Sequence, residues 1–249
     1  MIILETRHLT HAFPDGTVAI ENINLAIQDG EFVIIAGANG SGKTVLVRHF
    51  NGLLLPTKGK VFLEGVPITK NLTYARKQIG LIFQDSDSQI VGQTVADDVA
   101  FGPENLKLTP EEVNKRVKIS LEAVGLNHLA NQIPYSLSGG QKRKLAIAGI
   151  LAMKPRIIVF DEPFTGLDYP GVIQVLHQII SLHQKGHTII LVTHEIEKVL
   201  AHANRLVIME KGEIVKDGSP GEIITQVEQY GIRRPYGKSR GVETMTWLS

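Results

Sequence analysis

The amino-acid sequence predicts an α/β fold, in which helices cover both faces of a mostly parallel β-sheet. Short, almost wholly apolar runs rich in β-branched residues are typical of strands buried on both faces. Helical patterns separate these runs, and this alternation favours parallel pairing. A glycine-rich loop also leads directly from the first run into a helix. The expected strands of the main sheet lie at 32–35, 157–160 and 188–192.

The N-terminal part, to about residue 35, contains further strand-like pieces at 17–20 and 23–27. These pieces are short and close together in the chain. We therefore expect them to form an antiparallel layer against the main sheet.

Helices are predicted at 45–50 and 172–182. The second has apolar residues at helical spacing, and Gly186 is its expected stop. Residues 94–140 are more polar and mostly helical in pattern. We interpret them as a helical subdomain inserted into the α/β core.

One domain at 1–225 and a C-terminal tail at 226–249 are expected from the pattern and length. Ser219 and Pro220 predict a helix start, with the serine as the cap. The basic stretch at 233–240 is expected to be exposed.

The composition is that of an ordinary globular protein, with 43% hydrophobic and 20% charged residues among 249. The net charge of +1 gives no indication of a nucleic-acid partner. The absence of cysteine excludes disulfides and thiolate metal sites. The start lacks the pattern of a signal peptide, and no apolar run is long enough to cross a membrane.

The glycine-rich loop satisfies a complete phosphate-binding pattern between a strand and a helix. Its glycines let successive backbone N–H groups point at one anion, and the helix N-terminus adds its dipole. Lys43 would neutralise the β- and γ-phosphates of a nucleotide, and the Thr44 hydroxyl would ligate Mg²⁺. The loop predicts a P-loop NTPase core that binds ATP through Gly37, Ala38, Asn39, Gly40, Ser41, Gly42, Lys43 and Thr44.

A second strand ends in two carboxylates, Asp161 and Glu162. In P-loop ATPases an aspartate at this point helps to hold Mg²⁺. The next carboxylate is well placed to deprotonate or orient the attacking water. Taken alone, the pair could equally be surface groups at a strand end. Beside a P-loop, Asp161 is expected to be the metal residue and Glu162 the catalytic base.

The loop Ser138-Gly139-Gly140-Gln141 offers a hydroxyl and exposed N–H groups just before a helix that begins at about Gln141. With Leu137 before it, this loop resembles the signature motif of ABC ATPases. It also precedes the acidic strand, as it does in that family. The resemblance covers about 4–225 of the chain.

The other motifs of ABC ATPases occur in the family's order. The resemblance implies that Gln84 contacts Mg²⁺ or water and links the site to the helical subdomain. His194 resembles the switch histidine at the γ-phosphate, and Phe13 stands where an aromatic ring stacks on adenine. Asp168 lies in a segment that resembles the D-loop.

In this family two ATPase subunits close head to tail, and the signature loop of one completes the ATP site of the other. The resemblance therefore implies that this chain contacts, in trans, the ATP bound to a second subunit, identical or related. The residues that would make these contacts are Ser138, Gly139, Gly140, Gln141 and Asp168.

Residues 50–54 and 94–106 look like the ATPases of energy-coupling-factor importers, which take up cobalt, nickel or vitamins. This resemblance implies two membrane partners, a transmembrane scaffold and a solute-binding subunit. It also implies a peripheral location at the cytoplasmic face of the cell membrane. The ATPase of another ABC transporter class is the alternative within the family.

A soluble ABC ATPase acting on DNA or ribosomes is a further alternative. Such proteins usually carry two ATPase units or a long coiled coil, and this chain has neither. A GTP switch is disfavoured because the guanine-recognition motif is absent. His183 and His187 have metal-ligand spacing, but Gly186 intervenes and no third ligand is near.

Four positions depart from the common ABC pattern without removing a catalytic group. Val45 follows Thr44 where a second hydroxyl is frequent, and Lys144 stands where arginine is usual. Phe164 and Tyr169 flank the D-loop where smaller residues are more common. These departures bear on subunit pairing more than on hydrolysis.

Overall fold

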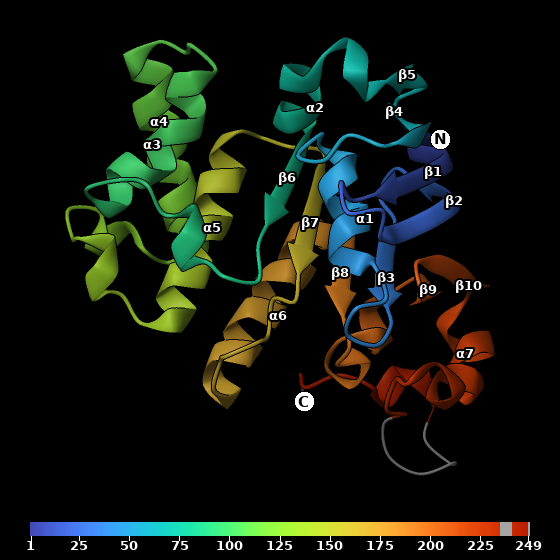
Figure 1. Ribbon diagram of the computed structural model, residues 1–249. Coiled ribbons are helices and arrows are strands. Elements are labelled where there is room, and N and C mark those ends of the chain that lie inside the picture. Colours follow the sequence, from blue (N-terminus) through green and yellow to red (C-terminus); the bar gives the residue numbers. More distant parts are fainter. Residues whose placement is uncertain (235–240, 249) are drawn as a thin grey trace.

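The computed structural model describes residues 1–234 and 241–248, and its centre is a six-stranded sheet in the order β10-β9-β3-β8-β7-β6 (Figure 1). Five of these strands run parallel, and β10 pairs with β9 in the antiparallel sense. The mostly parallel sheet expected from the sequence is thus confirmed. The strands are β3 (Phe32–Ala36), β6 (Ile79–Ile82), β7 (Ile157–Asp161), β8 (Thr188–Thr193), β9 (Arg205–Glu210) and β10 (Glu213–Gly218).

The pairing register brings three chain segments to one edge of this sheet. Ala36 at the end of β3 pairs with Thr193 of β8, and Asp161 at the end of β7 pairs with Val192. The loops that follow these strands therefore leave side by side. They carry the P-loop, Glu162 and His194, and ligands bind at this end of the strands in open α/β sheets.

A second, antiparallel sheet has the order β2-β1-β4-β5, and it confirms the expected N-terminal layer. The two strand-like pieces at 17–20 and 23–27 belong to one long strand rather than two. Bulges in its pairing with β1 account for the interruption in the apolar pattern. The strands are β1 (Ile2–Ala12), β2 (Val18–Gln28), β4 (Lys58–Leu63) and β5 (Val66–Pro67).

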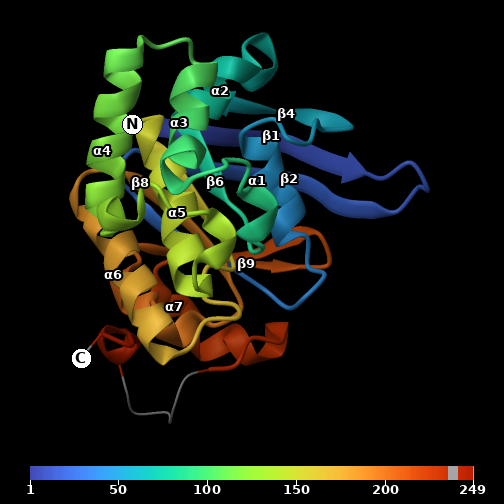
Figure 2. The ribbon, with the colours of Figure 1, turned by 90° about the vertical axis from the view of Figure 1, so that its left-hand side faces the viewer.

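Helices cover both faces of the central sheet, because α5 and α6 contribute to one hydrophobic cluster and α1 to the other. Helices α3, α4 and α5 pack on one another and form the predicted helical part, which faces the viewer in Figure 2. Helix α5 contacts both β6 and α6, and α6 also contacts β8. The division at 94–140 remains a prediction, since α5 belongs to this group but extends beyond residue 140. The α-helices are α1 (Lys43–Phe50), α2 (Leu72–Gln78), α3 (Val95–Asn105), α4 (Pro110–Val124), α5 (Gly139–Ala152), α6 (Tyr169–Gln184) and α7 (Pro220–Ile223).

Short 3₁₀ helices connect these elements at Ile68–Lys70, Asp87–Gln89, Asn127–Leu129, Pro134–Ser136, Ile196–Lys198, Leu200–His202, Ile224–Tyr230 and Val242–Thr244. The predicted start of α7 is confirmed, with Ser219 as cap and Pro220 in the first turn. The predicted stop of α6 is also confirmed, because Gly186 follows its end with a φ of 92°.

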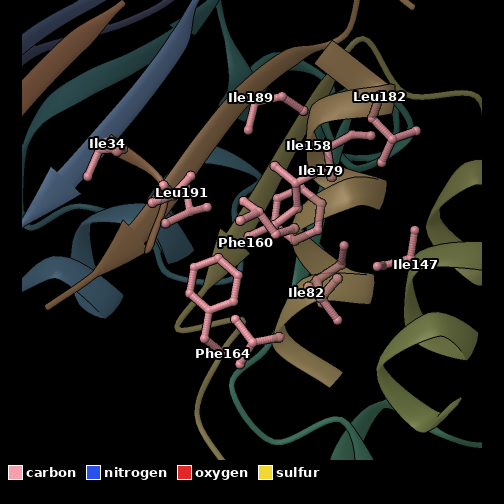
Figure 3. Packing of buried hydrophobic residues seen from close by; sticks show 14 of the residues in the cluster. Ile34, Ile82, Ile147, Ile158, Phe160, Phe164, Ile179, Leu182, Ile189 and Leu191 are labelled. Carbon is pink, nitrogen blue, oxygen red and sulfur yellow. The ribbon is translucent and has the colours of Figure 1, made fainter. Parts of the chain in front are cut away.

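Two hydrophobic clusters fill the space on the two faces of the central sheet. Because side chains alternate along a strand, Ile34 joins the cluster with α5 and α6, whereas Ile35 joins the cluster with α1. This arrangement explains why the sheet strands read as continuous apolar runs. Figure 3 shows the first cluster, in which strand residues Ile158, Phe160, Ile189 and Leu191 pack with Ile179 and Leu182 of α6.

The described residues of the C-terminal part pack on the body of the protein. Val227, Ile232 and Met245 are buried in the cluster that contains α6. Arg233 is exposed, as expected, whereas Arg234 is half-buried and its Nε is buried; residues 235–240 of the basic stretch lie outside the described residues. The division of the chain at residue 225 remains a prediction. In the described part of the chain, no helix is long and apolar enough to cross a membrane.

Candidate nucleotide-binding and hydrolysis site

The P-loop runs from the end of β3 to the first residue of α1. An added Cβ on Gly37 would lie 2.3 Å from the carbonyl oxygen of Met209, and Gly42 has a φ of 97°. Both positions therefore require glycine. The Lys43 ammonium donates to the carbonyl oxygens of Gly37 at 2.8 Å and Ala38 at 3.0 Å, which folds the loop around it. Burial lowers the pKa of Lys43, and the nearby Glu162 and Asp161 charges oppose this effect.

Thr44 and Asp161 meet although they are far apart in the sequence. The Thr44 hydroxyl donates to Oδ1 of Asp161 at 3.2 Å. Asp161 is buried at the end of β7, and burial raises its pKa, while the Thr44 hydrogen bond lowers it. Two oxygen ligands of the kind that Mg²⁺ prefers are thus held together at the base of the loop.

Glu162 and His194 form the next pair along the sheet edge. Nδ1 of His194 lies 2.9 Å from Oε1 of Glu162, and it donates when the glutamate is ionised. The backbone N–H of Glu162 donates to the Val192 carbonyl at 2.9 Å. Oε2 of Glu162 is buried and has no hydrogen-bond partner among the described residues. A buried carboxylate oxygen without a hydrogen bond is energetically unfavourable, and a hydrogen bond to Oε2 would stabilise this arrangement of Glu162.

The P-loop residues from Asn39 to Thr44, together with Glu162 and His194, line a hollow of about 750 Å³. Most of the predicted ATP-binding residues line it. Gly37, Ala38 and Asp161 do not line it; Gly37 and Ala38 accept hydrogen bonds from Lys43, and Asp161 accepts one from Thr44. Phe13 is 40% exposed at the rim, where its ring packs edge-on against His11 at 5.1 Å. The wall consists of Phe13, Thr17, Val18, Ala19, Asn39, Gly40, Ser41, Gly42, Lys43, Thr44, Val45, Gln84, Glu162, Thr165, His194 and Lys211.

A second hollow, of about 500 Å³, contains all five residues predicted to act in trans. It shares no lining residue with the first. Helix α5 begins at Gly139, two residues earlier than predicted. Ser138 and Gln141 cap its first turn reciprocally, and Asp168 caps α6 by accepting from the Gly171 N–H at 3.0 Å. The wall consists of Gly125, Leu126, His128, Ser138, Gly139, Gly140, Gln141, Lys144, Gly166, Leu167, Asp168, Pro170, Gly171 and Gln174.

Arg143 is a buried residue of α5 that sequence reasoning missed. Its guanidinium donates to the Phe83 carbonyl at 2.5 Å and to the Gln84 carbonyl at 2.7 Å. Burial lowers the pKa of Arg143, opposed by the Asp85 charge. Arg143 is the middle residue of three consecutive cations, Lys142 to Lys144, so no signal in the sequence distinguished it from its neighbours. The backbone of Gln84 is thus tied to the helix that begins at the second hollow.

The departures from the common pattern have different surroundings. Val45 lines the first hollow and Lys144 the second. Phe164 is buried in the core, and the Tyr169 ring lies 5.5 Å from the ring of Trp247.

The two histidines with metal-ligand spacing contact backbone carbonyls instead. His183 lies 3.0 Å from the Gly30 oxygen and His187 lies 3.0 Å from the Pro155 oxygen. Within the described ranges no group of three or more His, Cys, Asp or Glu could hold a metal ion.

Comparison with known proteins places this site in a family. The ABC transporter family model matches residues 20–165. An energy-coupling factor transporter ATP-binding protein EcfA of Methanocaldococcus jannaschii is 48% identical, over 92% of this chain and 83% of that protein. An EcfA2 protein of Clostridium tetani is 40% identical, over 93% of this chain and 85% of its own length.

Solved structures of ABC transporter ATPases also resemble this chain. The cbiO1 protein of Clostridium perfringens, described as part of the ABC transporter complex cbiONQ, has a TM-score of 0.82 and 36% identity, with 94% and 96% of the two chains covered. A dimeric ATP-binding cassette bound to ADP and Pi in a post-hydrolysis state has a TM-score of 0.77 and 30% identity, with 87% and 98% covered.

Proposed function

The chain belongs to the energy-coupling-factor ATPases of the ABC transporter family, and we propose that it hydrolyses ATP between two subunits to drive a membrane importer. The observation that carries the proposal is the separation of the site into two hollows with no common lining residue. One has the P-loop and the catalytic carboxylate, and the other has the signature loop. Each is half of a site that a second subunit completes.

ATP would occupy the first hollow with its phosphates on the P-loop. The backbone N–H groups from Gly40 to Thr44 and the start of α1 favour a polyanion. Lys43 would exchange its two carbonyl contacts for the β- and γ-phosphates, which restores the charge stabilisation that burial removes. Phe13 at the rim offers an exposed ring for adenine.

The residues present fit Mg²⁺ as the companion of ATP. Thr44 and Asp161 already share a hydrogen bond, and Gln84 lines the same hollow. Protein oxygens alone are too few for octahedral coordination, and nucleotide phosphates supply the remainder in such sites. Thr44, Asp161 and Gln84 would hold the ion, and its charge would offset the negative charge that develops on the phosphates.

Glu162 lines the first hollow and is positioned there to accept the proton of the attacking water. The water oxygen would bond to the γ-phosphorus as the bond to the β–γ bridging oxygen breaks, which yields ADP and inorganic phosphate. His194 holds Oε1 and borders the hollow beside it. It would thereby fix the carboxylate and contact the γ-phosphate.

The second hollow would meet the ATP of a second ATPase subunit, identical or related. Capping leaves the N–H groups of Gly139 and Gly140 in the first turn of α5 without intrahelical partners. Those groups and the helix dipole suit a γ-phosphate presented by the partner. Closure and reopening of the pair would deliver the mechanical step.

We place the pair on the cytoplasmic face of the cell membrane, bound to a transmembrane scaffold subunit and a solute-binding membrane subunit. Support comes from the cbiO1 relative, which is part of the cbiONQ transporter complex. Cobalt, nickel or a vitamin would be the solute, and no nucleic acid is involved.

The membrane assignment is tested by tagging the protein, extracting it gently in detergent and identifying what purifies with it by mass spectrometry. Co-purification of a transmembrane scaffold and a solute-binding membrane protein is expected. Recovery with ribosomes or DNA, or with no membrane protein, would overturn the transport role and leave the ATPase site intact.

The catalytic assignment is tested with Glu162→Gln, which keeps the size of the side chain but removes the base. The rate of ATP hydrolysis should fall by about 10²-fold or more, while ATP still induces pairing. Glu122→Gln on the exposed face of α4 is the control and should hydrolyse normally. Undiminished hydrolysis by Glu162→Gln would remove Glu162 from this role.

A further inference from the structure

The last described segment of the chain, residues 241–248, is hydrogen-bonded to the two short 3₁₀ helices that follow His194. The Ala201 N–H donates to the Met245 carbonyl at 3.0 Å, and the Trp247 N–H donates to the Lys198 carbonyl at 3.2 Å. Nε2 of His202 lies 2.8 Å from the Thr246 hydroxyl. The buried Met245 side chain anchors the segment in the core. The segment is therefore part of the folded body.

Trp247, the single tryptophan of the chain, contacts two functional loops at once. Its ring lies 4.5 Å from the Lys198 ammonium and 5.5 Å from the Tyr169 ring. Tyr169 directly follows Asp168 and begins α6. The tryptophan thus bridges the start of the D-loop helix and the segment after His194.

Lys198 connects this contact to the two catalytic loops. It is buried, and its ammonium donates to Oε1 of Glu195 at 2.6 Å. The same ammonium lies 5.6 Å from the ring of Phe164. Glu195 is next to His194, and Phe164 is two residues after Glu162. A desolvated ammonium held between two rings and a carboxylate is a strong attachment point.

The turns after His194 need such an attachment because they are short 3₁₀ helices. Ile196–Lys198 and Leu200–His202 each have only three residues, and the geometry of their hydrogen bonds is poorer than in α-helices. Elements of this kind depend on side-chain packing for a fixed position. Figure 3 shows Phe164 seated beside Phe160 of β7, which ties the other catalytic loop to the sheet core.

We propose that Trp247 is a positioning residue for ATP hydrolysis: through Lys198 and Tyr169 it fixes the loops that carry Glu162, His194 and Asp168. Trp247 lines neither hollow, so we expect its effect to reach the site through the loops that it contacts, with a larger change in kcat than in KM for ATP. This inference rests on the catalytic roles assigned to Glu162 and His194 above.

The test compares Trp247→Ala, Trp247→Phe and the control Leu248→Ala in the purified full-length chain. Leu248 packs on the same core cluster but has no aromatic ring to place against the Lys198 ammonium and the Tyr169 ring. We expect Trp247→Ala to lower kcat about tenfold with KM for ATP unchanged within about twofold. Trp247→Phe keeps an aromatic face and should recover most of the rate, and Leu248→Ala should keep it.

An unchanged kcat in Trp247→Ala would overturn the proposal, as would equal losses of kcat and thermal stability in Trp247→Ala and Leu248→Ala. Glu162→Gln is assayed in parallel, so that normal hydrolysis by that variant identifies failure of the catalytic assignment instead.

A second measurement applies if Trp247→Ala does not fold. Trp247 fluorescence in the native sequence should differ from that of free tryptophan and change on Lys198→Met, which removes the ammonium beside the ring. Fluorescence identical to that of an exposed tryptophan and insensitive to Lys198→Met would overturn the proposal.

Discussion

At the scale of single residues, Glu162, the proposed catalytic base, is held in an unfavourable backbone conformation. Its backbone has a φ of 49°, a conformation that costs a residue with a side chain about 1–3 kcal/mol. The bond from its N–H to Val192 and the contact of Oε1 with His194 maintain this conformation. The other carboxylate oxygen is left buried and unpaired among the described residues. The surrounding structure stabilises an arrangement that Glu162 would not adopt in isolation.

His49 gives a residue-scale prediction on pH. It is fully buried in α1, its Nδ1 lies 2.7 Å from the Val45 carbonyl, and its Nε2 lies 3.2 Å from Nδ1 of His11. Burial lowers the pKa of His49 below the ordinary value of 6.5. At a pH between the two pKa values, His49 is therefore protonated in the unfolded chain but neutral in the folded chain. The free energy of unfolding should therefore fall as pH drops below about 6.5 and level off below the folded pKa.

The measurement is urea unfolding at several pH values for the native sequence and for His49→Asn, which keeps a donor near Val45. Below pH 6.5, the slope of the free energy of unfolding against pH should be smaller in the variant, by at most about 1.4 kcal/mol per pH unit, which is the limit for one proton. Burial lowers the pKa of His187 and His202 too, so some slope should persist. His177→Gln on the exposed face of α6 is the control. An unchanged slope in His49→Asn would contradict the account.

At the scale of elements, α5 joins the two hollows of the molecule. Its first turn forms part of the second hollow. One turn later, Arg143 donates to the backbone carbonyl of Gln84, which lines the first hollow. Lys142 adds a 2.9 Å ion pair with Asp87 in the same segment. Movement of α5 on partner binding would therefore be transmitted to Gln84 through hydrogen bonds.

Arg143→Lys tests this link, because an ammonium cannot serve both carbonyls with the geometry of a guanidinium. We expect several-fold slower ATP hydrolysis and a lower Tm, since a buried carbonyl loses its donor at a cost of about 1–3 kcal/mol. Arg7→Lys, on the exposed surface of β1, should change neither. Native rate and Tm in Arg143→Lys would show that the link does not contribute.

The sequence analysis found those elements whose signals are local. The P-loop, the acidic pair and His194 each follow an apolar strand, so their position at one sheet edge could be predicted. Arg143 could not be found, because its role depends on packing between α5 and a carbonyl about 60 residues away. The two strand pieces of β2 were divided by bulges that reverse the apolar alternation locally.

At the scale of the whole molecule, one chain presents two separate hollows, which we propose to be the two halves of a shared nucleotide site. The C-terminal part was the least predictable region, because Trp247 and Met245 are isolated apolar residues with no periodic pattern around them. Their contacts are nevertheless with the loops that carry the predicted catalytic groups. Only the tertiary structure could place them there.

The central claim, that each ATP is hydrolysed between the P-loop of one chain and the signature loop of another, is tested most directly by complementation. Lys43→Ala and Ser138→Arg should each be nearly inactive, since every pair of identical variants lacks one half of both sites. Mixed pairs, isolated through two different tags, contain one complete site and should hydrolyse ATP at about half the native rate. Mixed pairs that form but remain inactive would contradict the account.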